Sequence, residues 1–158
     1  MISLARSALV LWAAVAIATG SVAAQEVDGV AEVRSGNEIR VGDTTMRLYG
    51  SSAPGPDEAC ESGERRFCCG VIAWSELIRL ADGYRVSCDI EDEHAPDGTS
   101  YATCYVGERD VNEALVRSGW AEAPQGVERY RVDQEDARRA RRGLWAGRIR
   151  PPDRRQAP

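Results

Sequence analysis

Carboxylates are the commonest groups in this chain that could act on a substrate or hold a metal, and they form two local clusters. The clusters are Asp57, Glu58 and Glu61, and then Glu91, Asp92, Glu93 and Asp97. Hard divalent cations prefer oxygen ligands of this kind, so each cluster is a candidate cation site. His94, the only histidine, lies within the second cluster. Acidic runs are more often solvated surface, so we expect no resident metal and an exposed His94.

Five cysteines supply a second kind of chemistry: Cys60, Cys68, Cys69, Cys88 and Cys104. Cys88 and Cys104 each fall in a run of alternating apolar and polar residues, which is typical of strands. The alternation places both sulfurs on one face, and we predict that they form a disulfide. Cys60 can pair with either of the adjacent Cys68 and Cys69. An odd count leaves one thiol over.

The N-terminus is typical of an export signal, which we assign to residues 1–24. Arg6 precedes an apolar run at 8–18, which is too short to span a bilayer, and small residues precede a cleavage site between Ala24 and Gln25. An uncleaved N-terminal anchor is the alternative. No later run is apolar enough to cross a membrane. We therefore expect a periplasmic or extracellular protein, in a compartment where disulfides form.

Charge is divided unevenly along the remaining chain. Residues 25–128 carry 9 Arg and 21 acids, a net charge of −12, whereas residues 129–158 carry 10 Arg and 4 acids, a net charge of +6. A body of this sign repels polyanions, so a nucleic-acid partner is not expected. The Arg-rich C-terminal helix is either a solvated face, which we favour, or a contact for an acidic partner.

Hydrophobic periodicity predicts the elements that must position these groups. Short apolar runs over 29–50 predict a β-meander, and the Pro- and Gly-rich residues 51–69 a loop. Residues 70–80 predict a helix that buries Val71, Trp74, Leu77 and Ile78. Strands follow at 84–90 and 102–106, with an acidic loop at 89–97 between them.

Two further helices complete the predicted order. Asp110 caps the first, with Glu113 three residues later, and Gly119 ends it. The second runs from about Glu128 to Arg142, before a disordered tail at 151–158. The order is that of an α+β protein, and five short strands with an interposed helix suit a small OB-type barrel.

Four segments of the sequence resemble the staphylococcal nuclease, or thermonuclease-like, family. They are Met46-Arg47-Leu48-Tyr49-Gly50 followed by Ala53-Pro54; Cys69-Gly70 with Ala73; residues 110–121, Asp-Val-Asn-Glu-Ala-Leu-Val-Arg-Ser-Gly-Trp-Ala; and Arg142-Gly143-Leu144-Trp145. The resemblance covers roughly residues 29–150. It implies one domain over 25–150, built as a five-stranded OB-type β-barrel with three helices.

The family's chemistry is Ca²⁺-assisted phosphodiester hydrolysis, with two Asp ligands, a general-base Glu and two Arg. The resemblance places the two Asp ligands at Ser35 and Ser52 and the general base at Gly55. It places the two Arg at Arg47 and Thr99. Only Arg47 keeps its family identity; it lies in a predicted strand, and we expect it to pair with a carboxylate. Asp43, in a Gly-Asp-Thr run, imitates the metal turn, but it lies too close to Arg47 and is read as a hairpin turn.

The resemblance also predicts which of the remaining cysteines form a disulfide. The family often has an aromatic residue before its Cys-Gly, where this chain has Cys68. We therefore predict Cys60–Cys69 with a buried free thiol at Cys68, and the alternative is Cys60–Cys68 with Cys69 free.

Three functions follow from these expectations. The first is an exported binding or structural module that lacks calcium-dependent hydrolysis and needs no cofactor. The second is a phosphodiesterase with a relocated metal site. The third is an accessory protein of the envelope or of polysaccharide production.

Overall fold

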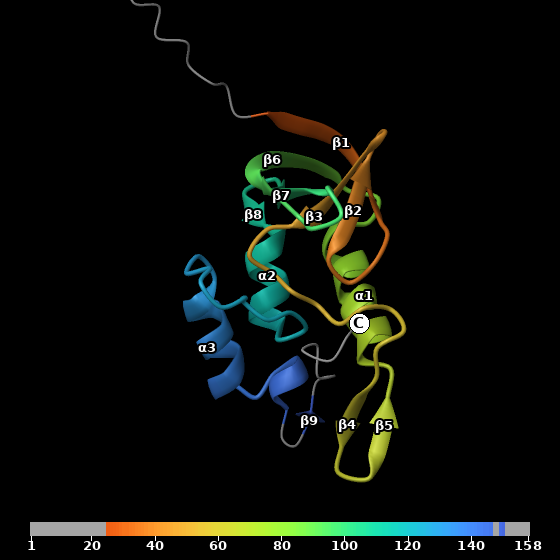
Figure 1. Ribbon diagram of the computed structural model, residues 1–158, viewed down its shortest axis with the longest axis vertical. Coiled ribbons are helices and arrows are strands. Elements are labelled where there is room, and N and C mark those ends of the chain that lie inside the picture. Colours follow the sequence, from red (N-terminus) through yellow and green to blue (C-terminus); the bar gives the residue numbers. More distant parts are fainter. Residues whose placement is uncertain (1–24, 147–148, 151–158) are drawn as a thin grey trace, which may run out of the picture.

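The computed structural model describes residues 25–146 and the two-residue strand at 149–150. The predicted signal peptide at 1–24 and the predicted tail at 151–158 lie outside the described residues. Barrel strands occupy one end of the molecule, three helices lie beneath them, and a hairpin projects at the far end (Figure 1). Among the described residues, no helix has the length and apolarity needed to cross a membrane.

The predicted meander is present as β1 (Glu26–Val33), β2 (Glu38–Val41) and β3 (Thr44–Leu48), paired antiparallel in that order. Alternation directs Ile39, Met46 and Leu48 inward, and each is fully buried. Val41 pairs with Thr44 across a two-residue turn. Asp43 is exposed at the tip of this turn, which confirms that it belongs to a hairpin.

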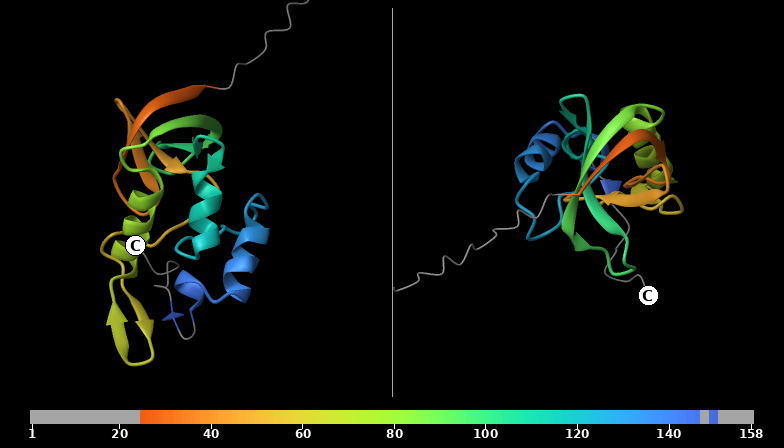
Figure 2. Two further views of the ribbon diagram at one scale, coloured as in Figure 1. Left: turned by 180° about the vertical axis from the view of Figure 1, so that it is seen from behind. Right: turned by 90° about the horizontal axis from the view of Figure 1, so that it is seen from above.

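Strands β6 (Arg85–His94) and β7 (Ser100–Val106) close the barrel. β6 pairs with β1 and β7, and β7 pairs in parallel with β3, so five strands form a ring (Figure 2, right). A short β8 (Arg109–Asp110) extends the sheet. The predicted acidic loop at 89–97 is wrong in extent, because β6 continues through an irregularity to His94. The actual turn spans only residues 95–99.

Helix α1 (Cys69–Ala81) packs beneath the barrel. Its buried face is Ala73, Leu77 and Leu80, whereas Val71 and Ile78 are 46% and 42% exposed. The predicted helix is thus confirmed, but its predicted buried face is wrong by part of a turn. Small residues such as Ala73 let the helix lie close to the barrel, and this contact selects the face.

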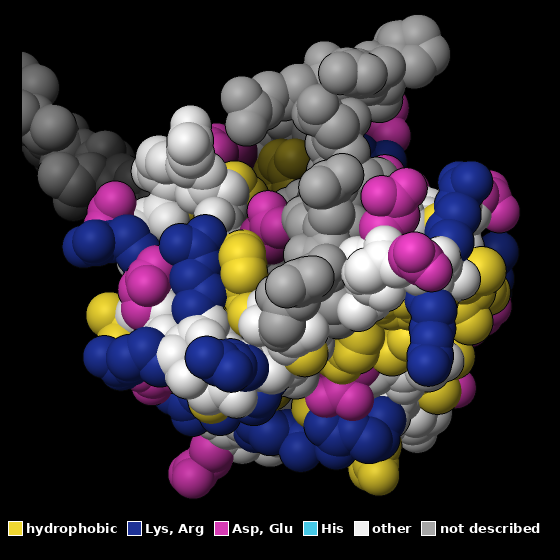
Figure 3. Space-filling view, turned by 90° about the horizontal axis from the view of Figure 1, so that it is seen from below, with side chains coloured by type: hydrophobic (Ala, Val, Ile, Leu, Met, Phe, Trp, Pro, Cys, Tyr) yellow, Lys and Arg dark blue, Asp and Glu magenta, His cyan; other side chains and the backbone are white. Residues whose placement is uncertain are grey.

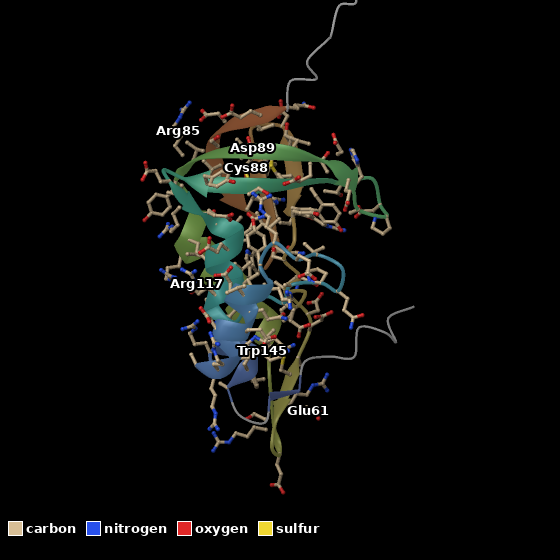
Figure 4. The ribbon with its side chains drawn as sticks, turned by 90° about the vertical axis from the view of Figure 1, so that its left-hand side faces the viewer. Glu61, Arg85, Cys88, Asp89, Arg117 and Trp145 are labelled. Atoms are coloured by element: carbon tan, nitrogen blue, oxygen red, sulfur yellow. A yellow bond between two sulfur atoms is a disulfide. The ribbon has the colours of Figure 1, made fainter. Side chains whose placement is uncertain are left out.

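Helix α2 (Val111–Ser118) begins and ends where predicted. The Asp110 side chain accepts a hydrogen bond from the Glu113 amide at 2.9 Å, and Gly119 adopts the left-handed φ of +83° that ends many helices. Arg117 reaches from α2 to Asp133 of the last helix at 2.7 Å, which ties the two helices together (Figure 4).

Helix α3 (Arg131–Arg139) is shorter than the predicted 128–142. After it the chain turns back towards Gly119, and the Leu144 amide donates to the Gly119 carbonyl at 2.8 Å. This return requires a 3₁₀ turn, η1 (Gly143–Trp145), in which Gly143 has a φ of +52°. The close backbone crossing, rather than the helical pattern of the sequence, ends α3.

The predicted loop at 51–69 contains a hairpin that the sequence did not indicate. It consists of β4 (Cys60–Ser62) and β5 (Arg65–Phe67), and β9 (Ile149–Arg150) pairs with β4. The hairpin projects away from the barrel (Figure 1).

Both predicted disulfides are present: Cys60–Cys69 joins the hairpin to the start of α1, and Cys88–Cys104 joins directly paired residues of β6 and β7. Cys68 is the free thiol, as predicted, but it is exposed rather than buried. The buried position goes to Cys69, whose sulfur pairs with that of the fully buried Cys60.

Candidate functional site

Some of the positions that the resemblance assigns to catalysis lie where the barrel meets the helices. The turn that holds Ser35 lies against the run after β3, because a side chain on Gly36 would come within 3.1 Å of Ala53. Ser52 pairs with Glu122 through two backbone hydrogen bonds of 2.8 and 2.9 Å, which fix this run in place. The fold therefore keeps the place of a site even where the side chains differ.

A pocket of about 320 Å³ lies at this place. Its lining consists of Asn37, Arg47, Tyr49, Gly50, Ser51, Ser52, Glu93, Tyr101, Pro124 and Val127. Two of the five family positions, Arg47 and Ser52, belong to this lining. Ser35, Gly55 and Thr99 do not. Asn37, two residues after Ser35 in the same turn, lines the pocket instead.

Strand alternation explains the main wall of the pocket. Met46 and Leu48 point into the barrel, so Arg47 between them points outward, and Tyr49 begins the segment after β3 on the same side. Tyr101 of β7 is the direct partner of Arg47 in the parallel pair. The two tyrosine rings meet edge to face, with centroids 6.2 Å apart and planes at 73°. Neither tyrosine was predicted as a site residue: Tyr49 appears above only within a family-like segment, although alternation from Arg47 could have identified it.

Arg47 is already bound to carboxylates of its own chain. Its Nη2 lies 2.7 Å from an oxygen of Asp97, and its Nε lies 3.6 Å from an oxygen of Glu38, its partner across β2 and β3. This confirms the predicted pairing. The Thr99 amide donates to Asp97 at 3.1 Å, and this bond, together with the charge of Arg47, holds the pKa of Asp97 below its usual range.

Thr99, which the resemblance places at the family's second Arg, is part of the turn at 95–99. Its amide binds Asp97, and its carbonyl accepts from the Ala95 amide at 2.8 Å. The turn thus presents the Asp97 carboxylate to Arg47, and it contributes no second cation.

The first acidic cluster does not replace the lost general base. Glu58 lies beside Gly55, but its carboxylate accepts the Gly55 amide at 3.0 Å and so caps the turn. Glu58 is absent from the pocket lining. Within the described residues, no three His, Cys, Asp or Glu side chains converge as a metal site would require.

Residues of the second acidic cluster contact different partners. Glu91 accepts from Thr103 at 2.7 Å and from Arg129 at 3.2 Å. Glu93 alone reaches the pocket lining. His94 is exposed, as predicted, and its Nδ1 lies 3.2 Å from the Asp92 carbonyl oxygen.

A second hollow, of about 470 Å³, lies between α1, α2 and Arg142. Its lining holds four arginines and four carboxylates. Arg79 binds Glu76 at 2.7 Å, and Arg117 binds Glu113 at 2.8 Å, so charges there are largely compensated. This balance makes it a weaker candidate than the Arg47 pocket.

Arginines of the C-terminal helix are also paired locally. The pairs are Arg131 with Glu128, Arg138 with Glu135, and Arg139 with Asp136. Figure 3 looks onto this end of the molecule and shows arginine and acidic side chains side by side. This arrangement fits the favoured reading of a solvated face.

Comparison with protein families gives one match. The model described as "Staphylococcal nuclease homologue" matches residues 72–147, which include most of α1, strands β6 to β8, α2 and α3. The match begins after Arg47, Ser52 and Gly55. Comparison with curated proteins found no match. The closed five-stranded barrel with three helices and this match agree, and the chain therefore contains a staphylococcal-nuclease-like domain.

Proposed function

We propose that the chain is an exported staphylococcal-nuclease-like module that binds a ligand or partner and does not hydrolyse phosphodiesters. The observation that carries the proposal is the state of Arg47, whose guanidinium is bound by Asp97 and faced by Glu38. An arginine that stabilises a phosphoryl transition state must offer its donors to the substrate. Here an incoming phosphate would have to displace a carboxylate.

Charge around the pocket supports the same conclusion. Arg47 contributes one positive charge, and Glu38, Asp97 and Glu93 contribute three negative charges, a net of −2. A phosphodiester is repelled by this arrangement.

A bound divalent cation is not expected to offset this negative charge. Ser35 and Ser52 offer neutral oxygens where the family has carboxylates, so a divalent ion loses most of its electrostatic attraction. Gly55 has no side chain to accept a proton from water, a role that contributes about 10²–10⁴ in rate.

Export is supported by the N-terminal sequence and by the two disulfides, which persist in oxidising compartments. We expect the exported protein to begin at Gln25. Intact-mass measurement of protein recovered from the periplasm or medium tests this expectation. A mass that retains residues 1–24 would contradict it.

The test of catalysis is cleavage of fluorogenic DNA and RNA by the disulfide-intact mature protein with Ca²⁺, Mg²⁺, Mn²⁺ or Zn²⁺. We expect no cleavage above the blank with any of these ions. Arg47→Ala and Arg85→Ala are the matched variants, because Arg85 is an exposed strand arginine remote from the pocket lining. Metal-dependent cleavage that Arg47→Ala abolishes and Arg85→Ala retains would refute the proposal and favour the phosphodiesterase with a relocated site.

A further inference from the structure

The pocket beside Arg47 has a feature that loss of catalysis does not explain. The Glu93 carboxylate lines the pocket, and among the described residues no hydrogen bond or ion pair engages it. Arg47, the only cationic residue of the lining, is engaged by Asp97 and Glu38. The uncompensated charge of the pocket is therefore negative.

Aromatic surface also lines this pocket. Tyr49 and Tyr101 both line the pocket and are partly buried, so their positions are fixed by the barrel. The negative face of an aromatic ring attracts a cation, and the attraction grows where water is partly excluded. Asn37 and Ser52 add neutral polar groups to the wall.

This inference rests on the proposed non-hydrolytic function. We propose that this pocket binds a single organic cation, the guanidinium or ammonium end of a basic group, between Glu93 and the two tyrosine rings. A pocket of about 320 Å³ accommodates one such group with its apolar stem. The stem would pack against Pro124 and Val127, and the charged end would face Glu93.

The probes distinguish the source of the ligand from the effect of its charge. Nα-acetyl-L-argininamide represents a basic side chain of a partner protein, and agmatine represents a free amine. Nα-acetyl-L-citrullinamide has nearly the same shape as the first probe without its charge. Thymidine 5′-monophosphate tests for an anionic ligand instead.

Binding is followed by isothermal titration calorimetry and by amide chemical shifts of the disulfide-intact mature protein. We expect the arginine probe to bind at least about fivefold more tightly than its citrulline counterpart, with shifts concentrated at Tyr49 and Tyr101. Tighter binding of agmatine would identify a free amine as the ligand, and tighter binding of the argininamide a partner's side chain.

Matched variants test which groups are responsible. Glu93→Gln is expected to weaken cation binding about fivefold, whereas Asp92→Asn, the same charge change one residue away and outside the lining, has an effect below about twofold. Tyr101→Leu is expected to weaken binding about threefold, and Tyr101→Phe to preserve it.

Equal binding of the arginine and citrulline probes, or no binding of either, would overturn the inference. So would tighter binding of the nucleotide. None of these results depends on the cleavage assay: absent cleavage with absent cation binding would leave the proposed function standing, and cleavage would refute that function on its own.

Discussion

Asn112 is the side chain whose removal we expect to damage this protein most. It is fully buried on α2 and spans the seam where the barrel closes. Its Nδ2 donates to the carbonyls of Tyr49, at 2.9 Å, and Ala102, at 3.0 Å. Its Oδ1 accepts the Cys104 amide at 3.2 Å. One residue therefore fixes α2 to the end of β3 and the middle of β7, beside the pocket wall.

The magnitude follows from these three bonds. Each contributes about 1 kcal/mol net, and Asn112→Ala also takes a partner from three backbone groups, of which the Ala102 carbonyl keeps the Tyr49 amide at 2.8 Å. We expect the free energy of unfolding to fall by about 3–5 kcal/mol, a large part of the ~5–15 kcal/mol typical of a domain. Asn112→Asp keeps the shape but turns a carboxylate oxygen towards the two carbonyls, so it should be comparably destabilising at neutral pH.

Urea unfolding of the disulfide-intact protein, followed by far-UV circular dichroism, measures the change. Gln125→Ala is the control, because it removes an exposed amide and should cost less than about 0.5 kcal/mol. A loss below about 1 kcal/mol for Asn112→Ala would refute the reasoning, since the three bonds could not then be holding the seam.

Three other predictions concern pH, backbone and disulfides. The pKa of Tyr130 is raised chiefly by burial of its hydroxyl and then by the nearby Asp110. The contribution of the neutral hydroxyl to stability is therefore complete below pH ~10 and is lost as the pH rises further. In Tyr130→Phe, urea midpoints should fall less steeply above pH ~10 than in the unaltered protein. Gly119→Ala should lower the free energy of unfolding by more than about 3 kcal/mol in thermal unfolding, because the added Cβ would lie 2.3 Å from a backbone carbonyl oxygen. The Cβ of Gly107→Ala meets nothing within 4 Å, so this control should cost only about 1–2 kcal/mol. Equal costs would contradict the prediction. Replacing both Cys88 and Cys104 with Ala opens a loop of 16 residues and should cost about 3 kcal/mol in urea unfolding, and an unchanged midpoint would show that the bond constrains little.

Much of the barrel could be predicted because its signals are local. Short apolar runs separated by turn residues identified the meander, and two-residue alternation identified the strands that carry Cys88 and Cys104, and so their disulfide. Asp110 and Gly119 located both ends of α2, since each acts on the backbone of its own helix. Signals of this kind depend on a few neighbouring residues and survive in any tertiary context.

Other features depended on contacts that no local pattern contains. The β4–β5 hairpin comes from a charged, Gly-containing run that is typical of a loop, and pairing of Glu61 with Arg150, far along the chain, extends it. The exposure of Val71 and Ile78 was decided by the close approach of α1 to the barrel at Ala73. Helical spacing gives the period of an apolar face, but packing decides which residues occupy it.

The sequence by itself predicted, through the family resemblance, that carboxylates are missing at Ser52 and Gly55, because the type of side chain at a position is visible without a structure. It also placed Arg47 in a strand. Only the tertiary structure decided what Arg47 faces, since Asp97 lies 50 residues away and reaches it through the parallel pairing of β3 and β7. The same pairing brings Tyr101 beside Tyr49, and the course of β6 brings Glu93 to the pocket, because chain closure rather than sequence proximity sets these neighbours.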